Sequence, residues 1–149
     1  MIEEIMDATE REGSDRAGRA RQVFDEFCAR HAIRVTAVPS TEAAATASWR
    51  EEVGREDEVV AIRGRLYDLI VVGRPVRDAP LPSPITLEAA LLDTGRPILV
   101  APPAALGDCG RHIAIAWEGS PEAARVISDA IPFLASARQV TILACETAL

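Results

Sequence analysis

The sequence contains no lysine, because all 16 of its basic side chains are arginines. This absence excludes sites whose chemistry needs a lysine amine, namely the P-loop, Schiff-base enzymes and the two-component receiver domain. The chain also lacks the acidic pair that a receiver domain carries at a strand end. Acidic residues number 23, so the net charge is -7. An acidic chain binds nucleic acid and anionic membranes poorly, and we expect neither as a partner.

Cysteine and histidine are also scarce. Cys28, Cys109 and Cys145 lie far apart and form neither a CxxC pair nor a zinc-ligand spacing, so we expect reduced thiols and no metal. The two histidines, His31 and His112, form no HxGH or HxxH motif, and the sequence has no GxSxG elbow. We therefore expect a protein that is not an enzyme and has no catalytic residues.

Long apolar runs are absent as well, so the sequence offers no candidate membrane span. The N-terminal stretch MIEEIMDATEREG is acidic and resembles neither a signal peptide nor a transit peptide. Together with the unpaired cysteines, this pattern predicts a cytoplasmic protein.

Aromatic residues make up only 4% of the chain, whereas hydrophobic residues make up 48%. The core must therefore be built from Ala, Val, Ile and Leu, a composition that suits buried parallel strands covered by helices. A length of 149 residues suits one domain with its own core.

Apolar segments alternate with helical ones along the chain. The clearest strand is YDLIVVGR, whose continuous apolar run predicts burial on both faces. This alternation is typical of βαβ units and predicts an α/β fold. We expect extended segments at 33–38, 45–53, 67–74, 96–102, 112–117 and 139–145, and helices at 2–31, 55–66, 85–94 and 121–137.

Two segments resemble the universal stress protein family. The first is YDLIVVGR followed by LEAALLDTGRPILVAPP, which is similar to the second half of the family's domain, with its DLIVVG and PVLVV strands. The second, HIAIAWEGSPEAARVISDAIPFLASARQVTIL, is similar to the start of the domain, especially in the second repeat of tandem bacterial members. Together the two segments cover about half of the chain.

The chain presents these parts in a permuted order. Residues 1–102 resemble the second half of the pattern, 103–111 form a linker without a helix, and 112–149 supply the first strand, helix and second strand. The chain is therefore either a fragment of a tandem protein or a single domain, 1–149, whose late strands complete the early sheet. In the second case we expect an open, mostly parallel five-stranded Rossmann-like sheet of order 3-2-1-4-5, with helices on both faces.

The linker is long enough for that closure. Ten extended residues reach roughly 33–36 Å, and the return path down one strand and across two neighbours takes about 20–30 Å. Closure within one chain is feasible, and closure between two chains as a strand-exchanged dimer is an alternative.

Some members of the family bind ATP through a G-x2-G-x9-G-S/T loop after a strand, where backbone N–H groups approach the phosphates. In this chain the first glycine is Gly73, but the second position holds Val76. The final pair falls at Pro84 and Ile85, if Glu88 matches the glutamate of the family's last helix. Most of the residues that define this phosphate-binding loop are therefore absent from the chain.

Other residues could still serve a nucleotide. Arg74 and Arg77 follow the strand 67–74, and arginine suits phosphate. Glu118 and Gly119 follow the strand 112–117, where the family's binders place an aspartate. With Gly73, these residues form the candidate nucleotide-binding site, because ligands of open α/β sheets bind beyond the carboxyl ends of the strands. We expect Ser120 to cap the following helix.

The resemblance implies a non-catalytic, cytoplasmic stress-response protein that acts through dimerisation and through binding of partners or ligands, without a cofactor. We expect a homodimer, formed through an edge strand near Pro97–Ala101 or by strand exchange. Other protein partners are also compatible with the resemblance. Two alternatives stay open: a member of the family that binds ATP or another adenine nucleotide with weak or no hydrolysis, and an incomplete fragment of a tandem universal stress protein.

Overall fold

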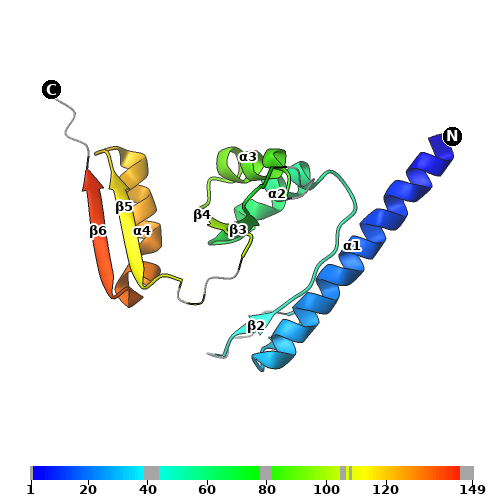
Figure 1. Cartoon of the computed structure of the whole chain (residues 1–149), viewed down its shortest axis with the longest axis horizontal. Helices are drawn as coiled ribbons and strands as arrows, with labels where there is room; N and C mark the ends of the chain where they lie inside the picture. Colours follow the sequence, from blue (N-terminus) through cyan, green and yellow to red (C-terminus); the bar gives the residue numbers. More distant parts are fainter. Residues whose placement is uncertain (1, 39–43, 78–81, 105–106, 108, 145–149) are drawn as a thin grey trace. The chain divides into compact units, whose positions relative to one another are not determined.

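A computed structural model describes residues 2–38, 44–77, 82–104, 107 and 109–144. The chain divides into two compact units, Met1–Val53 and Gly54–Leu149. Figure 1 traces the elements along the chain. The organisation of 1–149 as a single domain of the family stays a prediction.

The first unit consists of a long helix and a short parallel bridge. Helix α1 spans Ile2–Arg30, close to the predicted 2–31. Strand β1, Arg34–Val35, pairs in parallel with β2, Thr46–Ala47. Among the residues that the structure describes, no helix is both long and apolar enough to cross a membrane.

An aromatic contact joins this helix to the segment after β2. The rings of Phe24 and Trp49 lie 5.4 Å apart, and the Arg21 guanidinium lies 5.7 Å from each ring. Trp49 is thus a packing residue. The strand predicted at 45–53 is wrong beyond Ala47, because the segment that follows is charged and ends at a fully exposed Val53.

The second unit begins with a βαβ unit that is preceded by a short helix. Helix α2 spans Glu56–Arg63 and continues as a 3₁₀ helix, η1, over Gly64–Leu66, in agreement with the predicted 55–66. Strand β3, helix α3 and strand β4 follow, and β3 pairs in parallel with β4. Their bounds are Ile70–Gly73, Pro84–Asp93 and Ile98–Ala101.

The core of this βαβ unit lies between α3 and one face of the strand pair. Val72 is buried, as are Ala89 and Ala90 of α3. Val71, the next residue along the strand, is 59% exposed, and its register partner Leu99 is 43% exposed. The expected burial of 67–74 on both faces is therefore wrong: side chains alternate between the faces of a strand, and α3 packs on one face only.

Two arginines tie η1 to both ends of the connection between α3 and β4. The Arg96 guanidinium donates two hydrogen bonds to the carbonyl oxygen of Arg65, at 3.0 and 2.7 Å. The Arg65 side chain donates in turn to the carbonyl oxygen of Asp93, the last residue of α3. The buried Thr94 hydroxyl donates to the Ala90 carbonyl oxygen and accepts from the Arg96 N–H. These bonds satisfy carbonyl groups that the helix ends leave without partners.

A second βαβ unit follows (Figure 1). Strand β5 spans His112–Trp117, helix α4 Pro121–Ser136 and strand β6 Gln139–Ala144, close to the predicted bounds. The predicted end of the last strand, Cys145, lies outside the described residues. β5 and β6 pair in parallel from His112 opposite Gln139 to Trp117 opposite Ala144.

The single five-stranded sheet is not found. The described residues contain three separate parallel pairs, β1–β2, β3–β4 and β5–β6, and β5 does not pair with β3. The connection between β4 and β5 supplies a physical reason, because its described residues contain no helix, whereas a parallel neighbour usually needs a crossover that contains one. The α/β class is confirmed.

Gly64 provides a test of this packing. An added Cβ would stand 2.7 Å from Ile70 Cδ1 and 2.8 Å from Thr94 Cγ2, so the space between η1, β3 and the end of α3 has no room for it. We expect Gly64→Ala to lower the free energy of unfolding by about 1–3 kcal/mol, measured by urea denaturation. Gly18→Ala in α1, where nothing lies within 4 Å of the new Cβ, is the control and should be neutral or slightly stabilising. Equal effects of the two substitutions would contradict the packing described.

Candidate ligand and partner surfaces

The first part of the predicted site follows β3. The Arg74 N–H donates a 2.8 Å hydrogen bond to the Ala101 carbonyl oxygen, and the side chains of Arg74 and Arg77 are exposed. The space beside Gly73 is occupied, since a Cβ there would stand 2.6 Å from Pro82 Cγ. A proline ring therefore takes the space beside Gly73 that a side chain would need.

The start of α3 also differs from a phosphate-binding loop. Pro84 occupies the first turn of α3 and has no N–H to offer. The Ser83 hydroxyl caps the helix by accepting from the Ile85 N–H at 3.3 Å. The positions that would carry the family's final glycine and serine thus hold an ordinary capped helix start.

The second part of the predicted site follows β5. Gly119 has a φ of +80°, a conformation that favours glycine. The Ser120 hydroxyl donates to the Glu118 carboxylate at 2.9 Å and accepts from the Ala123 N–H at 3.0 Å. The expected capping role of Ser120 is confirmed. Glu118 itself is exposed and belongs to this cap.

The structure does not assemble the two parts into one site. Gly73, Arg74 and Arg77 follow a strand of the β3–β4 pair, whereas Glu118 and Gly119 follow a strand of the β5–β6 pair. The strand pairing that would bring their ends together is not present in the described residues. Their role in nucleotide binding stays a prediction.

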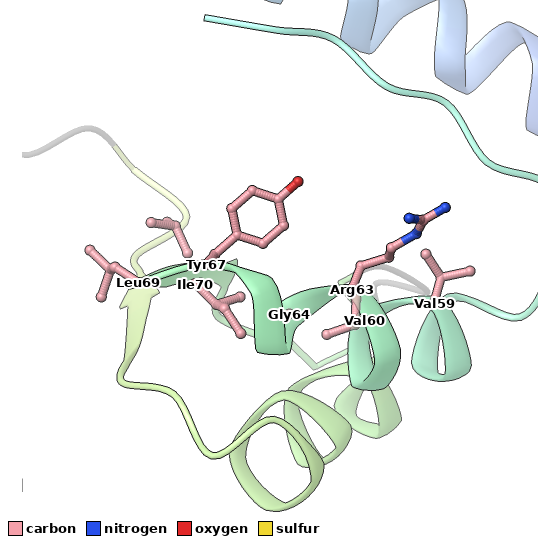
Figure 2. A pocket seen from close by; sticks show the side chains of 8 residues that line it. Val59, Val60, Arg63, Gly64, Tyr67, Leu69 and Ile70 are labelled. Atoms are coloured by element: carbon pink, nitrogen blue, oxygen red, sulfur yellow. The ribbon is translucent and has the colours of Figure 1, made fainter. Parts of the chain in front are cut away.

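Sequence reasoning missed an open apolar hollow of about 260 Å³ that lies against β3. Figure 2 shows that its walls come from α2, η1, β3 and the connection between η1 and β3, with Val60, Tyr67 and Ile70 among them. No residue of β4 or α3 contributes to it. The hollow therefore lies between β3 and the helical segment formed by α2 and η1.

A second apolar hollow, of about 380 Å³, lies between β5 and α4. Its walls include Ile113 and Ile115 of β5 and Val126, Ile127 and Leu134 of α4, while Glu118 and Glu122 stand at one end. No described residue of β6 contributes. The spacing of Val126, Ile127, Ala130 and Leu134 indicates an apolar helix face, but only the structure shows that this face stays partly uncovered.

Over the described ranges, no group of three His, Cys, Asp or Glu side chains could hold a metal ion. Comparisons of the chain with family models, curated proteins and solved structures gave no match.

The contact at Gly73 yields a testable prediction. We expect Gly73→Ala to lower the free energy of unfolding by about 1–3 kcal/mol, because the new methyl group would overlap the Pro82 ring. Gly107→Ala, with nothing within 4 Å, is the matched control, and both are read by thermal denaturation. An unchanged melting temperature for Gly73→Ala would contradict the contact.

The N-cap of α4 yields another testable prediction. Ser120→Ala removes the acceptor of the Ala123 N–H, so we expect a loss of about 1 kcal/mol in unfolding free energy. Ser120→Asp, which restores an acceptor, should recover most of the loss. Ser136→Ala, at the exposed end of the same helix, should have a smaller effect. A larger loss from Ser136→Ala would show that Ser120 is not the dominant cap.

Proposed function

We propose that the protein is a non-catalytic stress-response protein, similar to the universal stress proteins, that acts in the cytoplasm through dimerisation and through binding of partners or ligands. The observation that supports this proposal best is that β3–β4 and β5–β6 are only two strands wide, so that large apolar side chains stay exposed. The exposed apolar residues of these strands are Val71, Leu99, Val100, Trp117, Val140, Ile142 and Leu143.

A two-stranded sheet needs other elements packed on its faces to be stable. A pair of strands is marginal by itself, and each helix covers only part of its pair. Unpaired strand edges also offer rows of N–H and C=O groups to another chain. A dimer provides both cover for the exposed faces and a partner for an unpaired strand edge. It forms through the outer edge of β4 near Pro97–Ala101 or by strand exchange. The stress-response role rests on the YDLIVVGR and HIAIAWEGSPEAARVISDAIPFL motifs.

Nucleotide binding is the second candidate. Arg74 and Arg77 expose guanidinium groups after the carboxyl end of a parallel strand, and Gly119 precedes the N-terminus of α4. Ligands of open α/β sheets bind at such ends. The Pro82 ring beside Gly73 and the capped start of α3 weigh against a phosphate at that loop.

A thermal melt with and without ATP and Mg²⁺, combined with light scattering, tests the proposal. We expect a cooperative melt, a dimeric mass and no shift with nucleotide. A ligand at 100 times its dissociation constant would add about 2.7 kcal/mol, so an upward shift of several degrees would favour the nucleotide-binding candidate. A non-cooperative melt with binding of a hydrophobic dye would instead indicate an incomplete fragment, and a monomeric mass at all concentrations would reject dimerisation.

A further inference from the structure

We propose that the hollow between β5 and α4 binds an amphiphilic cation, a molecule with an apolar chain and one protonated amine. The walls of this hollow are apolar along its length, and two carboxylates stand at one end. The inference rests on the ligand-binding part of the proposed function and names the chemical class of the ligand.

The first argument is the shape of the hollow. Only residues 118–120 separate β5 from α4, so the helix runs back along the strand (Figure 1). The helical wall extends from Glu122 in the first turn of α4 to Leu134 in its last turn, a rise of about 18 Å. A volume of about 380 Å³ spread over that length is elongated, and it lies within the range of small-molecule sites. An extended chain fits this shape better than a compact ring.

The second argument is the composition of the walls. β5 contributes Ile113 and Ile115, while α4 contributes Val126 and Ile127. Val126 is 63% exposed, so an apolar chain that enters the hollow removes apolar surface of the protein from water as well as its own. Apart from the two glutamates, every residue that lines the hollow has an apolar side chain. The walls therefore favour a hydrocarbon chain over a polar molecule.

The third argument is the position of the charges. Glu118 follows the carboxyl end of β5 and Glu122 lies in the first turn of α4, so both carboxylates stand at the same end of the hollow. The Ser120 hydroxyl donates to the Glu118 carboxylate at 2.9 Å and helps to hold it there. Among the described residues, neither carboxylate has an arginine as an ion-pair partner. A cationic head group would supply the missing opposite charge.

This end of the hollow discriminates between classes of ligand. Two carboxylates repel phosphates and fatty acids, which disfavours both at this position. A metal ion would need more ligands, and the part of the chain that the structure describes has no group of three His, Cys, Asp or Glu side chains to hold one. An ammonium group carries three N–H donors, enough to reach Glu118 and Glu122 together. An apolar amine satisfies both the walls and the charged end.

Calorimetric titration of the full chain with octylammonium tests the proposal, with octanoate as the probe of equal length and opposite charge. We expect saturable binding of octylammonium, and binding of octanoate that is weaker by roughly tenfold or more. From butyl- through hexyl- to octylammonium, the affinity should rise by up to about fourfold per methylene group, because each added methylene leaves water. Equal affinity for octanoate would overturn the assignment of the head group. An affinity independent of chain length would place the amine on the carboxylates alone and overturn the use of the hollow.

Two variants locate the site. Glu118→Gln with Glu122→Gln keeps the shape of the hollow and removes both charges, so the affinity for octylammonium should fall roughly tenfold or more, while that for neutral octanol stays unchanged. Ala130→Phe places a ring in the hollow and should weaken octylammonium and octanol alike. The matched control is Glu12→Gln with Asp15→Asn, which removes the same charge from exposed positions of α1. This control should bind octylammonium as the unmodified protein does.

Light scattering on the same samples separates a failure of this proposal from a failure of the proposed function. A dimer that binds none of the amines would overturn the ligand and leave dimerisation standing, with the hollow covered by protein instead. A monomer that binds octylammonium in the expected way would reject dimerisation and keep the ligand. A loss of affinity in the control as large as in the Glu118 and Glu122 variant would show that the net charge of the chain attracts the amine, and would overturn the proposal.

Discussion

The parallel pairing of β3 with β4 is the constraint on which the packing of α2, η1 and α3 depends. Two backbone hydrogen bonds bracket it: the Ile70 N–H donates to the Pro97 carbonyl oxygen at 3.1 Å, and the Arg74 N–H donates to the Ala101 carbonyl oxygen at 2.8 Å. This register places Val72 under α3. It also leaves Val71 and Leu99 on the opposite face. A βαβ unit of this size can cover only one face by itself, so the other face must find cover elsewhere.

The elements of the second unit follow closely from the sequence because their signals are local. Ser120 and Pro121 mark the start of α4, Gly95 marks the end of α3, and the apolar runs at Ile70–Gly73 and Ile98–Ala101 mark strands. The strand predicted over 45–53 extends too far, because Trp49 packs on Phe24 and the charged residues beyond it have no strand neighbour in the described part of the chain.

The sheet and the candidate site could be predicted only in part. The residues at strand ends were identified correctly as such, since strand ends are local features. Whether β5 and β3 lie side by side depends on contacts between distant parts of the sequence, which local patterns do not encode. Likewise, glycine spacing could not show that Pro82 fills the space beside Gly73. The two apolar hollows depend on which neighbours a strand lacks. The spacing of residues along the sequence does not show this.

The links from Arg96 to Arg65 and from Arg65 to Asp93 have a consequence for the chemistry of the surface. Both use a guanidinium to hold a backbone carbonyl, and Arg96 reaches its carbonyl through two N–H groups at once. A lysine in the same place would be open to acetylation, which removes its charge. The junction between η1, α3 and β4 is therefore held by contacts that lysine acetylation cannot release.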